Sequence, residues 1–133
     1  DTSGRAARHR RRLGGAMRQV GVFAAAALHG FEQHRERLAE DHAHARRLAE
    51  ALAACPGVQL DLATVQTNIV VFHLGAEGPQ GADAAALVAA ARARGVLLNA
   101  FGPRTVRAVT HLDVTAAQCD EAARQLVALL GGR

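Results

Sequence analysis

Arginine is the residue type in this sequence with the clearest capacity for chemistry. All sixteen basic residues are arginine, and none is lysine. A guanidinium stays protonated and binds a carboxylate or a phosphate through paired hydrogen bonds, but it cannot form an imine with an aldehyde. The sequence therefore predicts recognition of anions. Any covalent amine chemistry must come from another chain or from residues outside this one.

Arg107 is the arginine whose position most demands a partner. It lies in an apolar stretch with Val106, Ala108 and Val109, which is predicted to be a strand. A guanidinium in such a place needs an ionic partner or a solvated cleft. Two interpretations stay open: recognition of an acidic ligand, or an ion pair with a nearby acid such as Asp113 or Asp61.

A second group of arginines flanks the glycine pair Gly14 and Gly15. Four arginines lie between residues 8 and 12, and Arg18 follows the pair. A helix is expected to begin at Ala16, and the free N–H groups at a helix start can bind an anion. The turn is thus a candidate anion site, although most Gly-Gly turns before helices bind nothing.

The histidines and cysteines give weaker candidates. His111 lies near Asp113 and could be an acid–base residue, but a strand-end cap is favoured. His73 is expected to be a core or edge residue. Four further histidines would need to converge on one face to bind zinc, and two of them point to nearly opposite sides of a helix, so we expect solvent-facing side chains. These four are His29, His34, His42 and His44, and the cysteines Cys55 and Cys119 are expected to be inert buried thiols.

The elements that must position these residues follow from apolar spacing and from turn residues. Residues 1–11 are expected to be a frayed terminus or the tail of an interrupted helix, and residues 75–81 a loop. Thr115 and Gln118 have the spacing of a capping box. Helices are predicted at 16–28, 31–54, 83–94 and 115–130, and strands at 58–62, 68–74, 96–99 and 105–109, with the last two strands forming a hairpin.

This order predicts an α+β fold with a small, mainly antiparallel sheet covered by helices on one face. The strand at 68–74 is apolar on nearly both faces, which indicates a central strand covered on both sides. The helix at 16–28 lies outside this packing and is expected to lie against another body.

Composition limits the classes of function. The 133 residues are 50% hydrophobic and 21% charged, which is typical of a single globular domain with a real core. Residues 1–18 hold six arginines and one acid, so a basic arm precedes a nearly neutral body. With no Trp or Tyr to stack on bases, nucleic acid is disfavoured against small anions. No apolar run is long enough for a membrane helix and no secretory signal is evident, so a cytoplasmic location is expected.

Two stretches together resemble L-threonine aldolases. Residues 13–19, LGGAMRQ, are similar to the LGGGMRQ segment of that family, and residues 106–114, VRAVTHLDV, to its VRxVTHLDV segment. Between them, residues 36–42 (ERLAEDH) and 66–68 (QTN) also resemble the family in the same order. The resemblance extends from about Arg8 to the C-terminus.

The resemblance implies a pyridoxal-phosphate enzyme of the aspartate-aminotransferase-like fold, which splits β-hydroxy-α-amino acids into glycine and an aldehyde. It covers only the C-terminal part of such an enzyme: residues 1–30 as a basic arm and connecting helix from the end of the large domain, and residues 31–133 as the small α+β domain. It implies that Arg107 binds the α-carboxylate of the amino acid, that Arg18 lies at the active site against substrate and cofactor, and that Arg11 lies near the cofactor phosphate.

The chain also departs from the family. Ala16 replaces the third glycine, and the cofactor lysine, the ring-stacking histidine and the usual base lie upstream in the family. We therefore expect no catalytic residue and no metal site in this chain, and a fragment that is inactive alone. The expected partners are the amino acid, an N-terminal large domain and further copies of the chain. The alternative is a non-catalytic interaction domain that docks through the Met17–Leu28 helix.

Overall fold

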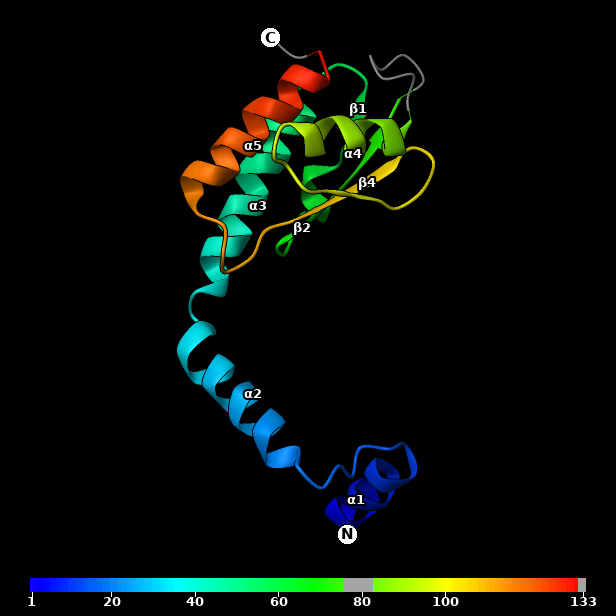
Figure 1. Cartoon of the computed structure of the whole chain (residues 1–133), viewed down its shortest axis with the longest axis vertical. Coiled ribbons are helices and arrows are strands. Elements are labelled where there is room, and N and C mark those ends of the chain that lie inside the picture. The colour runs from blue at the N-terminus through cyan, green and yellow to red at the C-terminus, as the bar shows by residue number, and fades with distance from the viewer. Residues whose placement is uncertain (76–82, 132–133) are drawn as a thin grey trace. The chain divides into compact units, whose positions relative to one another are not determined.

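The computed structural model describes residues 1–75 and 83–131, and it divides the chain into two compact units, Asp1–Glu36 and Arg37–Arg133 (Figure 1). Each unit is described by itself. Most of the loop predicted at 75–81 lies outside the described residues. None of the described helices is both long and apolar enough to span a membrane.

The first unit consists of two helices, α1 (Thr2–Arg12) and α2 (Val20–His34). The Asp1 carboxylate caps α1 by accepting a hydrogen bond from the Ser3 N–H at 3.0 Å. Of the two alternatives predicted for residues 1–11, the frayed terminus is wrong, because the chain is helical from Thr2 to Arg12.

The glycine pair ends a helix and does not begin one. The Gly14 and Gly15 N–H groups donate to the carbonyls of Arg11 and Arg10 at 3.2 and 2.8 Å, and Gly14 has a φ of 77°. These are the bonds of a left-handed helix C-cap, which glycine adopts at little cost. The helix predicted at 16–28 consequently begins later, at Val20. It also continues through Gly30, because one interior glycine costs only about 1 kcal/mol.

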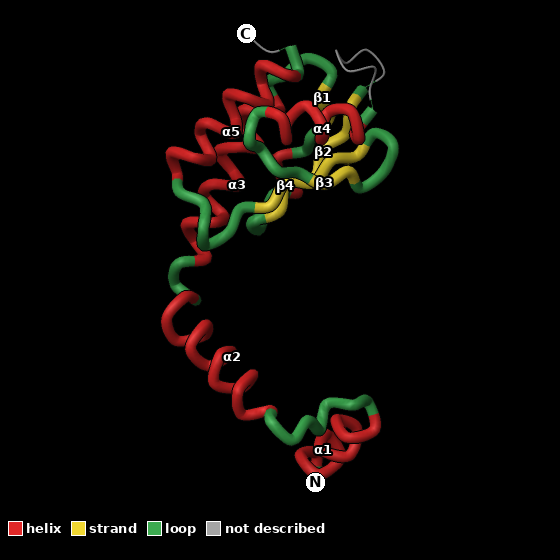
Figure 2. Tube along the Cα trace, viewed as in Figure 1, coloured by secondary structure: helices red, strands yellow, loops and turns green. Residues whose placement is uncertain are grey.

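The second unit is a four-stranded antiparallel sheet with three helices (Figure 2). The strand order is β1-β2-β4-β3, and every neighbouring pair is antiparallel. This confirms the predicted α+β class, the small antiparallel sheet and the β3–β4 hairpin. The elements are α3 (Leu38–Ala53), β1 (Val58–Gln59), a 3₁₀ helix (Leu62–Thr64), β2 (Ile69–Leu74), α4 (Ala84–Ala93), β3 (Asn99–Ala100), β4 (Thr105–Val109) and α5 (Ala116–Leu129).

Three further predicted boundaries are wrong. The helix predicted at 31–54 is interrupted at 35–37, although Arg35 and Arg37 keep right-handed helical dihedrals and no Gly or Pro marks the break. The strand predicted at 58–62 ends early because the Asp61 carboxylate accepts from the Ala63 N–H and starts a 3₁₀ turn. The strand predicted at 96–99 pairs only from Asn99.

The core lies between one face of the sheet and the helices. Side chains along β2 alternate between exposed and buried, so only one face of this strand is covered. The prediction that β2 is covered on both sides is therefore wrong: the second apolar face, with Ile69 and Val71, stays open within this unit. The fully buried large side chains are Phe72, Leu52, Leu87, Leu126, Val70 and Val106.

The capping box predicted at the start of α5 is confirmed. The Gln118 N–H donates to the Thr115 hydroxyl at 3.3 Å, and the Thr115 N–H donates to the Gln118 side-chain oxygen at 2.9 Å. This fixes the direction in which the chain enters α5 after β4.

Candidate functional site

Arg107 lies at the centre of β4 and points to the open face of the sheet. Its cross-strand partners are Val71 of β2 and Asn99 of β3. Val106 and Ala108, on either side of it, are buried against the helices, so the alternation of the strand places Arg107 on the opposite face. The side chain is half-buried there among exposed apolar neighbours, including Ile69 and Val109.

The Arg107 guanidinium has no acidic partner among the described residues. Its Nε is buried and has no hydrogen-bond partner among the described residues. Its Cζ lies 5.2 Å from the centre of the Phe101 ring, a cation–π arrangement. The interpretation of an ion pair with Asp113 or Asp61 is wrong: within the described ranges, six ion pairs lie within 4.0 Å and none includes Arg107. The geometry leaves this fork available to an anion.

Phe101 is the residue of this site that the sequence reasoning missed. It lies two residues beyond Asn99 in the hairpin loop, and the residue is 67% exposed. The available signal was an aromatic residue in a Gly-Pro turn six positions before an unpartnered arginine. Aromatic residues are few in this chain, which makes an exposed one informative.

His111 forms a local turn at the end of β4. The Asp113 N–H donates to His111 Nδ1 at 3.3 Å, and the Asp113 carboxylate lies 3.7 Å from the same atom. Both side chains are exposed. This arrangement fits the favoured interpretation, a strand-end cap.

The other histidines do not converge. No group of three His, Cys, Asp or Glu residues arranged to hold a metal occurs within residues 1–75 and 83–131. His73 lies outside the core on the open face of β2, with Nδ1 3.0 Å from the Thr105 hydroxyl. It is paired with Gln59 of β1 and Thr105 of β4, so the prediction of a core or edge residue is wrong. His29 and His42 are exposed as predicted, but His34 and His44 are half-buried, so the solvent-facing prediction is wrong for these two. The Nδ1 atom of His44 has no hydrogen-bond partner among the described residues.

The second group of predicted site residues lies in the first unit. Arg11 is on α1 and Arg18 is in the turn before α2, and both side chains are exposed. The glycine N–H groups beside them are occupied by carbonyls of α1, so the predicted backbone anion site is wrong. Because Arg11 and Arg18 lie in one unit and Arg107 in the other, a site shared by all three stays a prediction.

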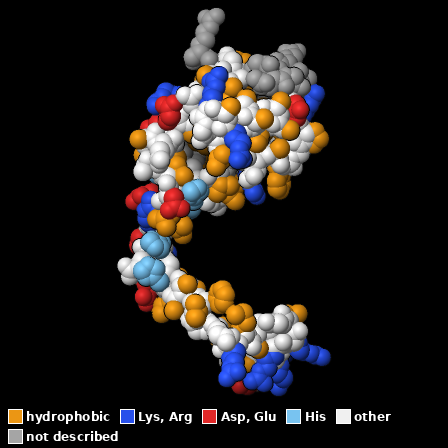
Figure 3. All heavy atoms as spheres, viewed as in Figure 1, with side chains coloured by type: hydrophobic (Ala, Val, Ile, Leu, Met, Phe, Trp, Pro, Cys, Tyr) orange, Lys and Arg blue, Asp and Glu red, His pale blue; other side chains and the backbone are white. Residues whose placement is uncertain are grey.

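Arginine side chains are nonetheless concentrated on α1, as the blue cluster in Figure 3 shows. They line a hollow of about 370 Å³. Guanidinium groups grouped in this way suit a phosphate or another anion. The lining residues are Arg5, Arg8, His9, Arg11 and Arg12.

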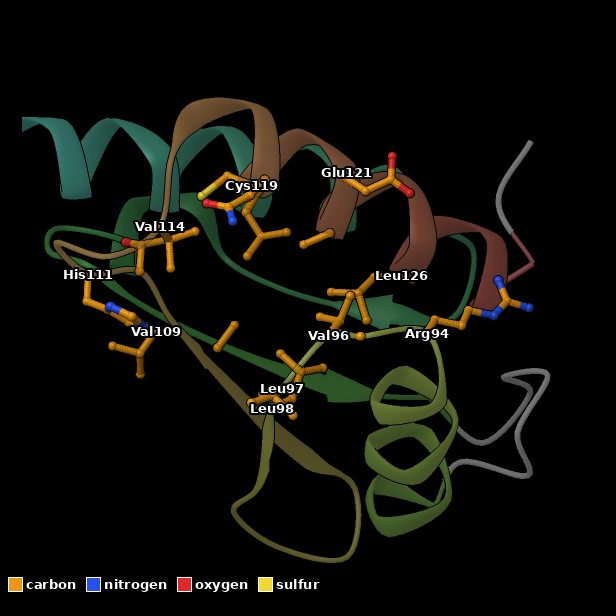
Figure 4. A pocket seen from close by; sticks show the side chains of 16 residues that line it. Arg94, Val96, Leu97, Leu98, Val109, His111, Val114, Cys119, Glu121 and Leu126 are labelled. Atoms are coloured by element: carbon orange, nitrogen blue, oxygen red, sulfur yellow. The ribbon is translucent and has the colours of Figure 1, made fainter.

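A separate pocket of about 350 Å³ lies between α5 and the segment that precedes β3 (Figure 4). Its wall is mostly apolar, with Val96, Leu98 and Leu126 among the lining residues, and Arg107 is not one of them. The charged side chains at its rim already have partners: Arg94 donates to Gln125, and Glu121 accepts from Arg124. The pocket therefore has few polar groups free to orient a charged ligand.

The two cysteines are buried, and their surroundings disfavour the nucleophilic thiolate form. Burial raises the pKa of the Cys55 thiol. Burial, followed by the charge of Asp120, raises the pKa of the Cys119 thiol. A thiol with a raised pKa carries less of the reactive thiolate at neutral pH, in agreement with the prediction of inert buried thiols.

Comparisons with known proteins identify the family. The family model for beta-eliminating lyases matches residues 3–74. Two low specificity L-threonine aldolases of Escherichia coli, from O157:H7 and from strain K12, are 40% identical over 126 residues, which is 95% of this chain and 35% of each relative. Low-specificity L-threonine aldolase 1 of Arabidopsis thaliana is 34% identical over 106 residues, 80% of this chain and 29% of the relative.

The match extends along nearly the whole chain, while the chain spans about a third of the length of these relatives. The family model covers α1 through β2, and the E. coli alignments cover 95% of the chain. The chain belongs to the beta-eliminating lyase family, and within it to the L-threonine aldolases, of which it represents a part.

Proposed function

We propose that this chain is the C-terminal part of a threonine aldolase that cleaves β-hydroxy-α-amino acids into glycine and an aldehyde, and that it supplies the substrate-carboxylate site. The observation that carries the proposal is Arg107, a guanidinium on the open face of the sheet whose buried Nε has no partner in the described part of the chain.

The role of Arg107 would be to hold and orient the α-carboxylate. Two parallel N–H···O bonds from the guanidinium fork fix both the position and the plane of a carboxylate. The apolar neighbours Ile69, Val71 and Val109 exclude water when this face is covered, which strengthens the pairing. Correct orientation of the Cα–Cβ bond lowers the barrier for its cleavage, because the entropy of alignment is lost on binding and not in the reaction step.

The residues present fit the anionic part of pyridoxal phosphate and not its aldehyde. Arg11 and Arg18 are exposed guanidinium groups, and α1 carries a hollow lined with arginine, which suits a phosphate. With no lysine, the chain cannot hold the aldehyde covalently. When bound, this cofactor supplies an electron sink for the cleaved bond. We propose that Arg11 holds its phosphate and that Arg18 lies beside substrate and cofactor.

The proposal requires a further segment that carries the cofactor lysine, and it makes the chain inactive alone. The alignment with this chain covers only 35% of the E. coli relatives, which supports this requirement. We also propose that the complete enzyme is a homo-oligomer and that it is located in the cytoplasm. Exposed apolar side chains on the open face, such as Ile69 and Val71, support association with another polypeptide.

The test replaces Arg107 with alanine in a full-length aldolase that contains this chain. We expect kcat/KM for threonine to fall roughly 10- to 100-fold, the value of a charge-assisted hydrogen-bonded pair, and to recover only partly in Arg107→Lys, because an ammonium cannot bind bidentately. Arg92→Ala removes an exposed arginine of α4 and is the matched control. An unchanged kcat/KM in Arg107→Ala would contradict the proposal.

A second candidate is a non-catalytic interaction domain that docks through α2. It is favoured by the exposed Val22, Phe23 and Leu28 on a helix with no buried residue. The orange side chains along this helix are visible in Figure 3. Absorbance of bound pyridoxal phosphate, measured with and without the N-terminal half of a relative, separates the two candidates: the first expects a cofactor band in the mixture, and the second expects none.

A further inference from the structure

The aromatic ring of Phe101 faces the Arg107 guanidinium in a cation–π geometry, with 5.2 Å between Cζ and the ring centre. Phe101 is 67% exposed, although an aromatic ring of this size gains stability from burial. The exposed ring is placed beside a guanidinium whose Nε has no hydrogen-bond partner in the described chain. The pairing therefore needs an explanation other than packing of the core.

The loop that carries Phe101 is held on both sides by backbone hydrogen bonds. The Phe101 N–H donates to the Thr105 carbonyl at 2.7 Å. The carbonyls of Pro103 and Arg104 accept from the N–H groups of Ala84 and Leu74 at 2.9 and 2.8 Å. The loop is thus tied to the start of α4 and to the end of β2. A ring on so constrained a loop can hold a flexible neighbour in place.

The cation–π contact between Phe101 and Arg107 leaves the N–H donors of the guanidinium free to bind a ligand. A carboxylate partner would also hold the arginine, but it would occupy the same N–H fork that a ligand carboxylate needs. An aromatic face attracts the cation through its quadrupole and leaves the N–H groups at the edge of the guanidinium plane unused.

We propose that Phe101 is a positioning residue, which holds the Arg107 guanidinium ready for the α-carboxylate of an amino acid. This inference rests on the proposed function of Arg107. Phe101 acts through the arginine, so its loss weakens binding of the amino acid and leaves the bond-breaking step little changed.

The kinetic test uses Phe101→Leu, Phe101→Tyr and Phe101→Trp in a full-length aldolase that contains this chain. Leucine keeps an apolar cover but removes the aromatic quadrupole, so we expect KM for threonine to rise about 3- to 10-fold with kcat within about 2-fold. Tyrosine and tryptophan keep an aromatic face and are expected to retain a KM within about 2-fold of the wild-type value. A leucine variant with unchanged KM, or aromatic variants as impaired as leucine, would overturn the inference.

The spectroscopic test needs no activity and uses the 133-residue chain. The ring current of Phe101 should shift the Nε–H proton resonance of Arg107, and Phe101→Leu should remove that shift. Phe31 is the matched control, since its ring lies at the same 5.2 Å from the guanidinium carbon of Arg35. Phe31→Leu should move the Arg35 resonance and leave that of Arg107 unchanged. An Arg107 resonance unaffected by Phe101→Leu would overturn the inference.

The two proposals can fail separately. If Arg107→Ala lowers kcat/KM while Phe101→Leu changes neither KM nor the Arg107 resonance, the substrate site stands and the positioning role is wrong. If Arg107→Ala has no effect on kcat/KM, the proposed function is wrong, and the positioning role toward a carboxylate is wrong with it, whatever the resonance shows.

Discussion

The hydroxyl of Thr110 donates a hydrogen bond to the main-chain carbonyl of Asp41 at 2.6 Å. These residues are 69 positions apart, and both are buried. The bond joins the end of β4 to the first turn of α3, so it holds the strand that carries Arg107 against the helical layer.

Replacement of Thr110 by valine should therefore destabilise the chain by about 0.5–1.5 kcal/mol, because it removes a buried hydrogen bond between the end of β4 and α3. Urea unfolding followed by circular dichroism measures the change. Thr67→Val is the matched control: Thr67 is exposed, and its substitution should change the free energy of unfolding by less than about 0.5 kcal/mol. Equal effects of the two substitutions would contradict the prediction.

Replacement of Thr115 by alanine should cost about 1 kcal/mol of unfolding free energy, since it removes the side-chain acceptor for the Gln118 N–H at the start of α5. Thermal unfolding measures this loss. Thr115→Ser keeps a hydroxyl at the same position and should recover most of the stability. A serine variant as unstable as the alanine variant would show that the methyl group, and not the cap, is responsible.

Glu121 should make the free energy of unfolding decrease as the pH is lowered into the acidic range. The hydrogen bond from the Gln125 side chain, then the hydrogen bond and charge of Arg124, lower the pKa of Glu121 below its ordinary 4.5. The unfolded chain therefore takes up a proton on Glu121 at a higher pH than the folded chain does. Its contribution to stability is present above pH 4.5 and is lost as the pH falls through the lowered folded-state pKa.

The measurement compares unfolding of the wild type and of Glu121→Gln between about pH 2 and 7. The variant should show a smaller loss of stability in the acidic part of this range. Glu50→Gln, which removes a carboxylate paired with Arg46 on α3, tests whether any exposed acid gives the same result. Superimposable curves for the wild type and Glu121→Gln would rule out the effect.

The thiols of Cys55 and Cys119 should react with a disulfide reagent only when the chain unfolds. Both are buried and their pKa values are raised by burial, so access and thiolate content are low together. The reagent should titrate both cysteines rapidly in denaturant and slowly in native buffer at pH 7.5. Rapid reaction of either thiol in native buffer would disprove this.

Much of the second unit could be predicted from local sequence signals. The capping box at Thr115 and the β3–β4 hairpin carry cap and turn residues at fixed spacing, and the structure has both. The break at 35–37 could not be predicted, because its residues favour helix and the interruption has no local marker. One relevant contact is distant: Arg37 donates to the Leu112 carbonyl at 3.1 Å.

The candidate site was predictable in part. Arg107 could be singled out because a charge in an apolar strand requires a partner. Which of the two open interpretations holds could not be decided, since ion pairs depend on where other elements place their acids. The prediction that the Gly14–Gly15 turn begins a helix is wrong for a related reason. Two adjacent glycines can precede one helix or end another, and only the hydrogen bonds to the carbonyls of Arg10 and Arg11 distinguish these cases.

The apolar run of β2 has a consequence for how the strand finds its place. Residues 69–72 are all apolar, yet only alternate ones are buried, so sliding by one position would still present hydrophobic side chains to the helices. Alignment must come from polar contacts near the strand ends, where Asn68 donates to the Thr110 carbonyl at 2.6 Å and His73 meets the Thr105 hydroxyl at 3.0 Å. Loss of both contacts would permit a misaligned sheet with an intact hydrophobic interior.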